Sequence, residues 1–272
     1  IGRAALGNPW VFAQIKAALA GRAGEAAETS VQARWDCMLR LAELTIEVHA
    51  SRLGTRDVRW MLDRMHPLTQ NTPKPLLKVA GKTLIEHQLA RLQRAGITNV
   101  VINHSYLGSQ IETALGDGAH YGLSINYSAE PVRLETAGGI IEALPLLQEP
   151  SFVVVNADIW CDFDVASLAP VVAQLAAGSD DLAFLVLVDN ASHNPKGDFS
   201  LDESGRIGLP SDATQQAPGC VTNENLTFSG ISVLSRALFA GCGSGPRPLL
   251  PLLLAAIEAG KVSGVHHRGL WV

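Results

Sequence analysis

Three groups of residues in this chain have the chemistry that phosphoryl transfer requires. Asp158 follows the apolar run 152–156, and an aspartate at the end of a buried strand suits a divalent cation, which prefers hard oxygen ligands. Lys74 stands between two prolines, which predict a stiff, extended, non-helical segment. Gly138 and Gly139 open a predicted helix, whose first-turn amides are free to hydrogen-bond a ligand. Positioned cations and amides around phosphates are what such reactions need.

Each of these signals also has a purely structural explanation. Asp158 could cap a helix or close a turn, and Lys74 could be an incidental charge on a surface turn. Two glycines before a helix are a weak signal by themselves. Asp162 and Asp164 lie in a polar loop, where we expect capping or solvated carboxylates. The functional interpretation therefore depends on all the groups lying in one crevice.

Strands and helices alternate after Pro67, which implies a parallel sheet with helices on both faces and ligands at the carboxyl ends of its strands. Short apolar or alternating stretches predict strands, and amphipathic stretches that end at glycines predict helices. The predicted strands cover residues 99–103, 124–128, 151–156, 182–188 and 228–234, and the predicted helices cover 83–95, 107–115, 137–144 and 249–259.

Composition narrows the class of function. The chain has 272 residues, of which 47% are hydrophobic and 17% charged, so it can build a large core. Its net charge of −5 argues against general nucleic-acid binding. The four cysteines are scattered without metal-ligand spacing, which favours free thiols in a reducing cytoplasm. They are Cys37, Cys161, Cys220 and Cys242. No apolar run reaches the roughly 18 residues that a membrane span needs.

The motifs between Arg64 and Val272 resemble those of the sugar-1-phosphate nucleotidyltransferases, and most of all the N-acetylmuramate-1-phosphate uridylyltransferases of peptidoglycan recycling. The family's opening signature is matched by Arg64-Met-His-Pro-Leu-Thr69 and Thr72-Pro-Lys-Pro75. Further matching motifs follow in the family's order. They are Ile102-Asn-His104, Leu134-Glu-Thr-Ala-Gly-Gly139, Val155-Asn-Ala-Asp158, Gly197-Asp-Phe199, Thr227-Phe-Ser-Gly-Ile-Ser232 and Lys261-Val-Ser-Gly264.

The resemblance implies a Rossmann-like, glycosyltransferase-A-like mixed sheet and a set of site residues. The implied reaction is attack by the phosphate oxygen of a sugar 1-phosphate on the α-phosphorus of UTP, with Mg²⁺ held by Asp158. Lys74 and Arg64 would neutralise the triphosphate. The implied nucleotide-binding residues are Asn103, Glu130, Thr136, Gly138 and Gly139, and the implied sugar-phosphate-binding residues are Asn156, Ser229 and Gly230.

The first part of the chain resembles a different family. Residues 1–10 are similar to the end of the flavin barrel of tRNA-dihydrouridine synthases, and residues 9–20 and 31–49 have the helical spacing of the domain that follows it. The family's catalytic cysteine and most of its barrel have no counterpart here. We therefore expect a helical segment at 1–62 and a nucleotidyltransferase domain at 63–272.

The sequence departs from the nucleotidyltransferase pattern at two places. The family's first strand and Gly-rich loop should precede Arg64, but residues 55–63 contain no glycine. A second metal-binding aspartate should follow Val272, where the sequence stops, and the sequence begins at Ile1 rather than methionine. These departures predict a fragment or fusion that lacks the usual first strand, folds poorly and catalyses slowly.

Three functions are consistent with these observations. The first is a cytoplasmic nucleotidyltransferase, acting on UTP and a sugar 1-phosphate, with impaired activity. The second is an RNA-binding helical remnant of a tRNA-dihydrouridine synthase that carries a passenger domain, and net acidity counts against it. The third is a non-catalytic nucleotide-binding protein. The sequence does not specify the sugar or the oligomeric state.

Overall fold

A computed structural model describes residues 71–79, 81–191, 194–210 and 224–271. Nearly all of them belong to one compact unit, made of residues 65–78 and 82–272. Arg64, the helices predicted before it and the predicted boundary at residue 62 lie outside the described residues. Within the described part of the chain, no helix is long and apolar enough to cross a membrane.

Helix α6 (Leu84–Arg94) shows how local sequence fixes an element's start. Thr83 Oγ1 accepts a hydrogen bond from Glu86 N, and the Glu86 carboxylate accepts one from Thr83 N at 2.6 Å. This reciprocal capping box satisfies two amides of the first turn, and the bond from Thr83 N lowers the pKa of Glu86. The helix ends before Gly96, which has a φ of +79°. The predicted helix is confirmed. Short elements precede it: η2 (Lys74–Leu76), β1 (Lys78–Val79) and β2 (Lys82–Thr83).

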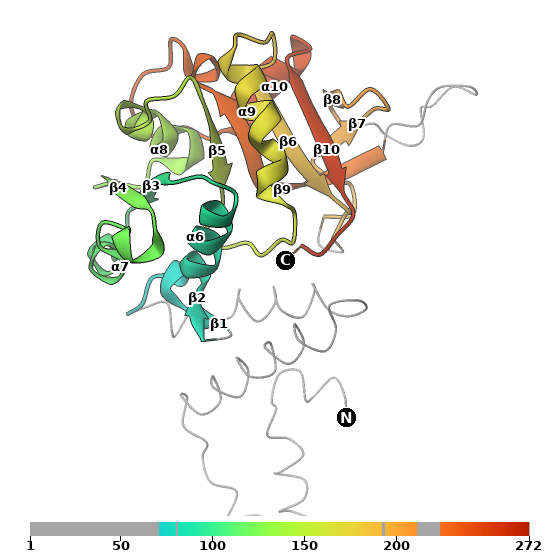
Figure 1. Ribbon diagram of the computed structural model, residues 1–272. Helices are drawn as coiled ribbons and strands as arrows, with labels where there is room; N and C mark the ends of the chain where they lie inside the picture. The colour runs from blue at the N-terminus through green and yellow to red at the C-terminus, as the bar shows by residue number, and fades with distance from the viewer. Residues whose placement is uncertain (1–70, 80, 192–193, 211–223, 272) are drawn as a thin grey trace, which may run out of the picture. The chain divides into compact units, whose positions relative to one another are not determined.

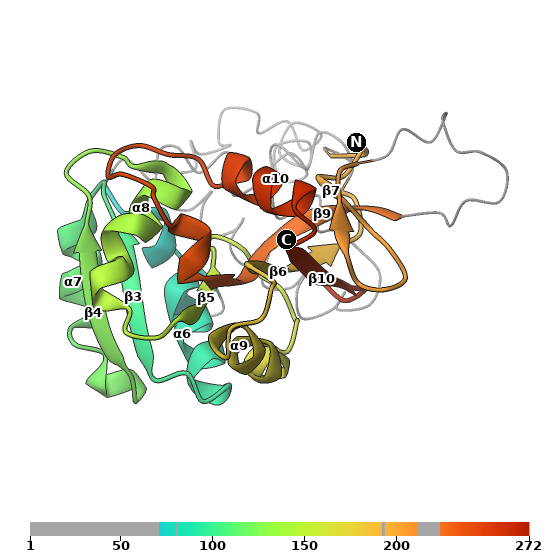
Figure 2. The same cartoon turned by 90° about the horizontal axis from the view of Figure 1, so that it is seen from above.

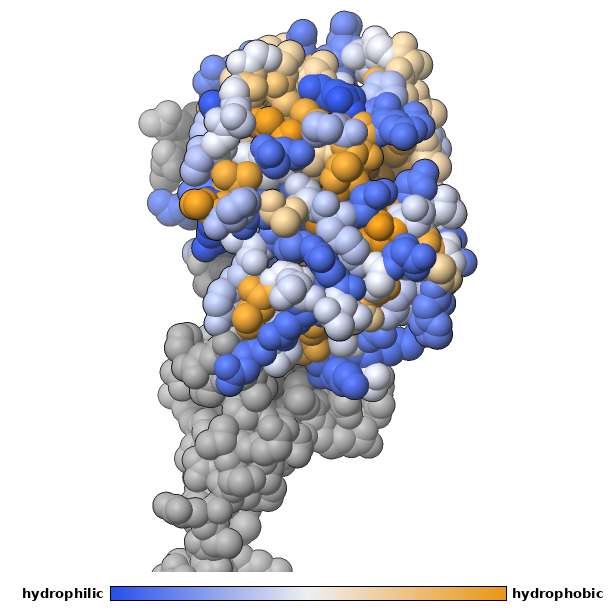
Figure 3. Space-filling view, turned by 90° about the vertical axis from the view of Figure 1, so that its left-hand side faces the viewer, coloured by the Kyte–Doolittle hydropathy of each residue, from blue (hydrophilic) through white to orange (hydrophobic). Residues whose placement is uncertain are grey.

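The next two strands form a small parallel sheet. Strand β3 (Asn99–His104) pairs in register with β4 (Ser124–Ala129), and α7 (Gly108–Leu115) and the short helix η3 (Ala119–Tyr121) connect them. Apolar residues of α6, α7 and both strands pack into one cluster. Figure 1 shows these elements next to one another. The face over β4 and α7 in Figure 3 carries apolar side chains scattered among hydrophilic ones.

The larger sheet is mixed, with strand order β10-β6-β9-β7-β8 and β5 paired to β9. Strand β9 runs antiparallel to β5, β6 and β7, whereas β10 runs parallel to β6. The expectation of a wholly parallel sheet is therefore wrong, and the mixed sheet implied by the family resemblance is confirmed. Strand β9 is buried along most of its length, so its apolar pattern carries no sign of direction. The strands are β5 (Ser151–Val155), β6 (Ala183–Val188), β7 (Phe199–Leu201), β8 (Ile207–Gly208), β9 (Glu224–Ser235) and β10 (Val262–His267).

Helices cover both faces of this sheet. Helices α8 (Glu135–Ala143) and α10 (Leu250–Glu258) pack with the short helix η6 (Arg236–Phe239) in one apolar cluster. Helix α9 (Ala169–Ala176) and η5 (Val165–Leu168) pack in the other. Figure 2 shows α10 and α9 on opposite sides of β6. The sequence patterns did not predict α9, β7 or β8, and a further short helix, η4 (Leu144–Leu146), follows α8.

Strands β5 and β3 each have an edge at which the first strand, whose absence the sequence predicts, could pair. Strand β5 pairs with β9 on one side, and β3 pairs with β4 on one side. Within the described ranges, no strand pairs with the other edge of either one. A strand that paired there would satisfy the amides and carbonyls of these edges. Because the residues before 71 are not described, the absence of the first strand stays a prediction.

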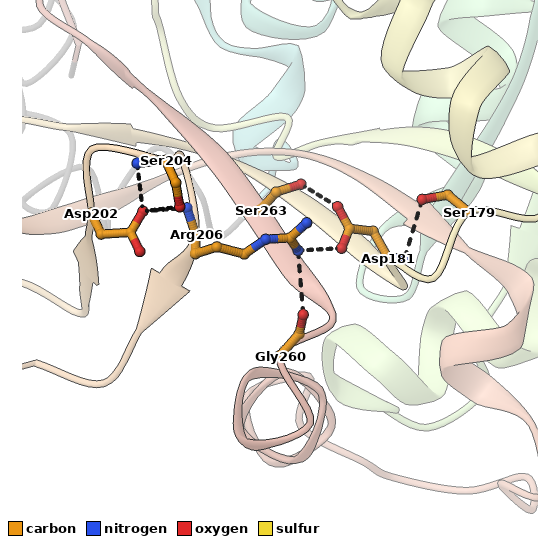
Figure 4. Close-up of polar contacts among 7 residues, drawn as sticks. All are labelled: Ser179, Asp181, Asp202, Ser204, Arg206, Gly260 and Ser263. Carbon is orange, nitrogen blue, oxygen red and sulfur yellow. Dashed lines mark hydrogen bonds and ion pairs between the residues drawn. The ribbon is translucent and has the colours of Figure 1, made fainter.

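A buried carboxylate joins three strands of the larger sheet. Asp181, which is 5% exposed, lies just before β6. Arg206, just before β8, donates through Nη1 to Asp181 Oδ1, and Ser263 Oγ of β10 donates to Asp181 Oδ2 at 2.7 Å. Arg206 also donates to Gly260 O at 3.3 Å. Figure 4 shows these contacts converging on Asp181. The charge of Asp181 is thus compensated on both of its oxygens.

We predict that Arg206→Met lowers the free energy of unfolding by about 1–3 kcal/mol, because a buried carboxylate loses its charged partner. Urea denaturation measures the change. Arg268→Met is the matched control, since Arg268 is 76% exposed and lies 3.7 Å from the exposed Glu224; its effect should stay below about 1 kcal/mol. Equal losses in the two variants would contradict the assigned importance of burial.

Candidate active site

Lys74 and Asp158, which are 84 residues apart in sequence, form an ion pair. Lys74 Nζ lies 3.0 Å from Asp158 Oδ2, and the two side chains are 33% and 49% exposed. Lys74 begins the 3-10 turn η2 behind Pro73, so the expectation that it lies in a non-helical segment is wrong. Proline at the second position of the turn fixes a φ that a 3-10 turn also accepts. The predicted phosphate-binding cation and the predicted metal ligand are therefore brought together.

Asp158 lies at the edge of the sheet where α/β proteins bind ligands. Strands β5 and β6 both run antiparallel to β9, so they run in the same direction, and β10 is parallel to β6. Their carboxyl ends consequently share one edge. Asp158 follows the carboxyl end of β5, which gives its carboxylate this location.

The carboxylate of Asp158 suits a divalent cation. This exposed carboxylate is a hard oxygen ligand, and Mg²⁺ is usually held by one or two carboxylates, with phosphates and water completing its shell. Two other groups in the described part of the chain have metal-ligating side chains close together, and Asp158 belongs to neither. These are Cys161 with Asp162 and His267, and Asp189 with Glu224 and His266. Both are already linked internally, through His267–Asp162 at 2.6 Å and His266–Asp189 at 2.8 Å.

A second set of predicted residues meets at the start of α8. Asn103, on β3, donates through Nδ2 to Gly139 O at 2.6 Å and lies 3.4 Å from Glu130 Oε1. Glu130, which follows β4, accepts a hydrogen bond from Leu134 N at 3.1 Å. A Cβ on Gly139 would lie 2.3 Å from Glu130 Oε1. Three predicted nucleotide-binding residues therefore form one hydrogen-bonded unit.

The first turn of α8 is already partly satisfied within the protein. The amides of Ala137 and Gly138 both donate to Arg247 O, at 3.0 and 3.1 Å, and Arg247 N donates to Leu134 O. The expectation that these amides are free for a ligand is therefore wrong, because the loop before α10 caps them. Gly138 packs closely against this loop, and Glu135 has a φ of +60°, a strained conformation for a residue other than glycine.

Thr136 lies in the same turn and is exposed. Its predicted contact with the nucleotide stays a prediction, as do the contacts of the other site residues.

The predicted sugar-phosphate residues lie at an irregularity in β9. The pairing of β9 with β6 shifts register between Ile231 and Phe228, and Gly230 has a φ of +85°. Asn156 N donates to Gly230 O at 3.0 Å, and a Cβ on Gly230 would lie 2.8 Å from Asn156 Nδ2. Irregularities of this kind re-aim side chains next to active sites.

Ser229, by contrast, has no exposed surface, and its Oγ accepts a hydrogen bond from Ile231 N at 3.1 Å. Its carbonyl accepts from the indole of Trp271 at 2.8 Å. The position of its side chain does not support the predicted sugar-phosphate contact.

The sequence interpretation missed Gln88, Arg91 and Arg247. Gln88 and Arg91 of α6 donate to carbonyls of the segment that contains Asp158. The available signal was Gln88 itself, a polar residue within the apolar stripe of an amphipathic helix. Arg247 acts through its backbone, which any residue has, so no signal in the sequence identified it.

Comparison with known proteins identifies the family of this chain. The nucleotidyl transferase profile matches residues 63–208. The chain belongs to the nucleotidyl transferase family. An N-acetylmuramate alpha-1-phosphate uridylyltransferase of Neisseria meningitidis is 46% identical over 212 residues, which are 77% of this chain and 87% of the relative. The protein of the same name from Caulobacter vibrioides is 34% identical over 231 residues, or 83% of this chain and 89% of that one.

Solved structures confirm the nucleotidyltransferase-like fold. HddC from Yersinia pseudotuberculosis has a TM-score of 0.59 at 17% identity and covers 74% of this chain and 84% of its own. A UDP-glucose pyrophosphorylase has a TM-score of 0.55 at 16% identity, with 77% and 88% covered. The family match begins at residue 63, and residues 1–62 are not described. Their resemblance to tRNA-dihydrouridine synthases stays a prediction.

The two glycines of this nucleotidyl transferase differ in what surrounds them, and we predict unequal costs of substitution. A Cβ at Gly138 would lie 2.4 Å from Gly245 O and 3.1 Å from Arg247 N, which are backbone atoms. Gly138→Ala should therefore destabilise the fold by about 1–3 kcal/mol. At Gly139 the nearest atom is the carboxylate oxygen of the Glu130 side chain, which can shift more easily than backbone, and the helix propensity of alanine offsets the crowding by up to about 1 kcal/mol.

Chemical denaturation of both variants gives the comparison. A Gly139→Ala variant that is less stable than Gly138→Ala would show that the backbone contacts of Gly138 yield easily.

Proposed function

We propose that this chain transfers a uridylyl group from UTP to N-acetylmuramate 1-phosphate and releases pyrophosphate, a reaction that belongs to peptidoglycan recycling. The two relatives described above bear the name of this activity. The observation that carries the proposal is the Lys74–Asp158 ion pair beside the carboxyl end of β5. Because it combines a phosphate-neutralising cation with a metal-binding carboxylate, this edge of the sheet suits nucleotide triphosphate chemistry.

In the proposed reaction, a phosphate oxygen of the sugar 1-phosphate attacks the α-phosphorus of UTP. A new P–O bond forms, the bond to the bridging oxygen of pyrophosphate breaks, and its electron pair leaves with pyrophosphate. When bound at Asp158, Mg²⁺ would neutralise phosphate charge. The Lys74 ammonium would compensate the negative charge that develops on the phosphoryl oxygens, with Arg64 in the same role.

The remaining site residues would orient the two substrates. Asn103 and Glu130 hold the loop before α8 and the backbone of Gly139, which supports a nucleotide-binding role for this group together with Thr136 and Gly138. Asn156, two residues before Asp158 in the sequence, donates through its backbone N to Gly230 O, which supports binding of the sugar phosphate there. The reduced turnover and the cytoplasmic location expected from the sequence stay predictions.

Asp158→Asn should abolish Mg²⁺-dependent binding of UTP, because the neutral amide is a poorer ligand for a hard cation. The fold should remain, since the carboxylate is about half exposed and makes a surface ion pair. Isothermal titration calorimetry with and without Mg²⁺ measures binding. Glu258→Gln, which neutralises an exposed carboxylate at the end of α10, is the control. Binding by Asp158→Asn that equals binding by the parent would show that the metal ligand is elsewhere.

The proposed substrates predict selectivity for the base. UTP should bind more tightly than ATP or GTP, and UTP with N-acetylmuramate 1-phosphate should yield pyrophosphate and the UDP-sugar. Thermal shift with each nucleotide measures binding, because a ligand of the native state stabilises it. Chromatography of the products measures transfer. Equal affinity for all three nucleotides would indicate a site for phosphates alone, and the absence of UDP-sugar would overturn the proposal.

A further inference from the structure

Two side chains of α6 bind the backbone of the segment that contains Asp158. Gln88 Nε2 donates to Ile159 O at 2.5 Å, and Arg91 Nη2 donates to Phe163 O at 2.9 Å. The partners in these bonds are 71 and 72 residues apart in sequence. Ile159 directly follows Asp158, so the first bond fixes the peptide between Ile159 and Trp160, one residue beyond the carboxylate.

Gln88 is buried and Arg91 is partly buried. Gln88 is 5% exposed, and its Oε1 accepts a hydrogen bond from Arg91 Nη1 at 2.8 Å. Burial lowers the pKa of the Arg91 guanidinium, so its charge is kept away from water at a cost. The same face of α6 buries Leu84, Ile85 and Leu89. An apolar residue at 88 would avoid the cost of burying an amide, so the polar pair must be explained by what it binds.

The beginning of the same helix is bound to the segment that contains Lys74. Leu84 N, in the first turn of α6, donates to Leu77 O at 2.9 Å, and Leu77 N donates to Lys74 O at 3.1 Å. Helix α6 thus contacts the backbone on the Lys74 side at its start and the backbone on the Asp158 side further along. Since a helix is rigid at this length, it sets the separation of the two segments.

A second contact limits movement of the Asp158 segment on another side. Asp162 N donates to Leu270 O at 3.0 Å, and Cys161 and Trp271 form an isolated antiparallel bridge. His267, at the end of β10, lies 2.6 Å from Asp162 Oδ1. The segment therefore lies between α6 and the chain that follows β10, and its position is fixed by hydrogen bonds from both.

We propose that Gln88 and Arg91 are positioning residues, which hold the backbone that carries Asp158 in the place that metal-dependent nucleotide binding requires. They act through the carbonyls of Ile159 and Phe163. This inference rests on the proposed function. A misplacement of about 1 Å at a reacting centre can cost on the order of 100-fold in rate, and groups that orient a metal ligand typically change metal affinity by about 10–100-fold.

The test replaces each donor with an unbranched side chain that cannot donate a hydrogen bond. In Gln88→Met and Arg91→Met, kcat for uridylyl transfer should fall about 10- to 100-fold, and the Mg²⁺ concentration for half-maximal activity should rise about tenfold. KM for the sugar 1-phosphate should change little. Arg94→Met is the matched control, because Arg94 is exposed in the last turn of α6 and bonds within its own helix, to Ala90 O. It should leave all three parameters unchanged.

A conservative variant and a reaction-independent measurement complete the experiment. Arg91→Lys keeps one donor and should lie between Arg91→Met and the parent, and it decides the outcome if a methionine variant does not fold by circular dichroism. Binding of Mn²⁺ alone, measured by electron paramagnetic resonance, should weaken in the folded variants. Folded variants with the Mn²⁺ affinity of the parent would overturn the inference, whether or not the parent transfers uridylyl groups. For an active parent, an unchanged kcat and Mg²⁺ dependence would overturn it as well. A parent that binds Mn²⁺ through Asp158 but makes no UDP-sugar would overturn the proposed function alone.

Discussion

The site depends on one ion pair whose members are supplied by distant parts of the chain. Lys74 lies in the 3-10 turn η2, before helix α6, and Asp158 follows β5. Their charged atoms nevertheless lie 3.0 Å apart. Neither residue lies in a strand, so no ladder of the sheet fixes them directly. Their meeting requires that the loop after β5, helix α6 and the turn η2 keep fixed relative positions. Hydrogen bonds from α6 to both segments provide this connection, and the apolar packing of α6 holds the helix in place.

Two glycines of the site permit close contacts between segments of the protein itself. Gly138 and Gly230 both lie where another segment approaches too closely for a Cβ, the loop before α10 in one case and Asn156 in the other. These close approaches bring the loops of neighbouring elements to the carboxyl edge of the sheet. The glycines therefore permit close packing between segments, and the capped amides of Ala137 and Gly138 are part of that packing. A pattern of glycines can reveal that something comes close, but it does not distinguish a ligand from the protein's own backbone.

Local patterns in the sequence predicted most elements of the fold because their causes are local. The capping box at Thr83 and the glycine after α6 fix that helix within the chain. The direction of β9 is instead decided by its pairing with β5 and β6, which no periodicity records, and β7 and β8 are only 3 and 2 residues long. The residues of the site also divide into those that the sequence indicates and those that only long-range contacts reveal. Family motifs named Lys74 and Asp158, whereas Gln88 and Arg91 have their role only through contacts about 70 residues away in sequence.

The exposure of the Lys74–Asp158 pair is suited to exchange of partners. An ion pair that is a third to a half exposed is worth about 0–1 kcal/mol, so separating its members costs little. Without a ligand, each charge neutralises the other and neither is left uncompensated. A divalent cation bound with a nucleotide triphosphate would offer Asp158 a positive partner and Lys74 negative ones, so both charges would stay compensated after the exchange. A fully buried pair would resist this exchange, because separation would leave desolvated charges. Partial exposure at this edge of the sheet, combined with a rigid backbone beneath it, therefore permits binding without rearrangement of the fold.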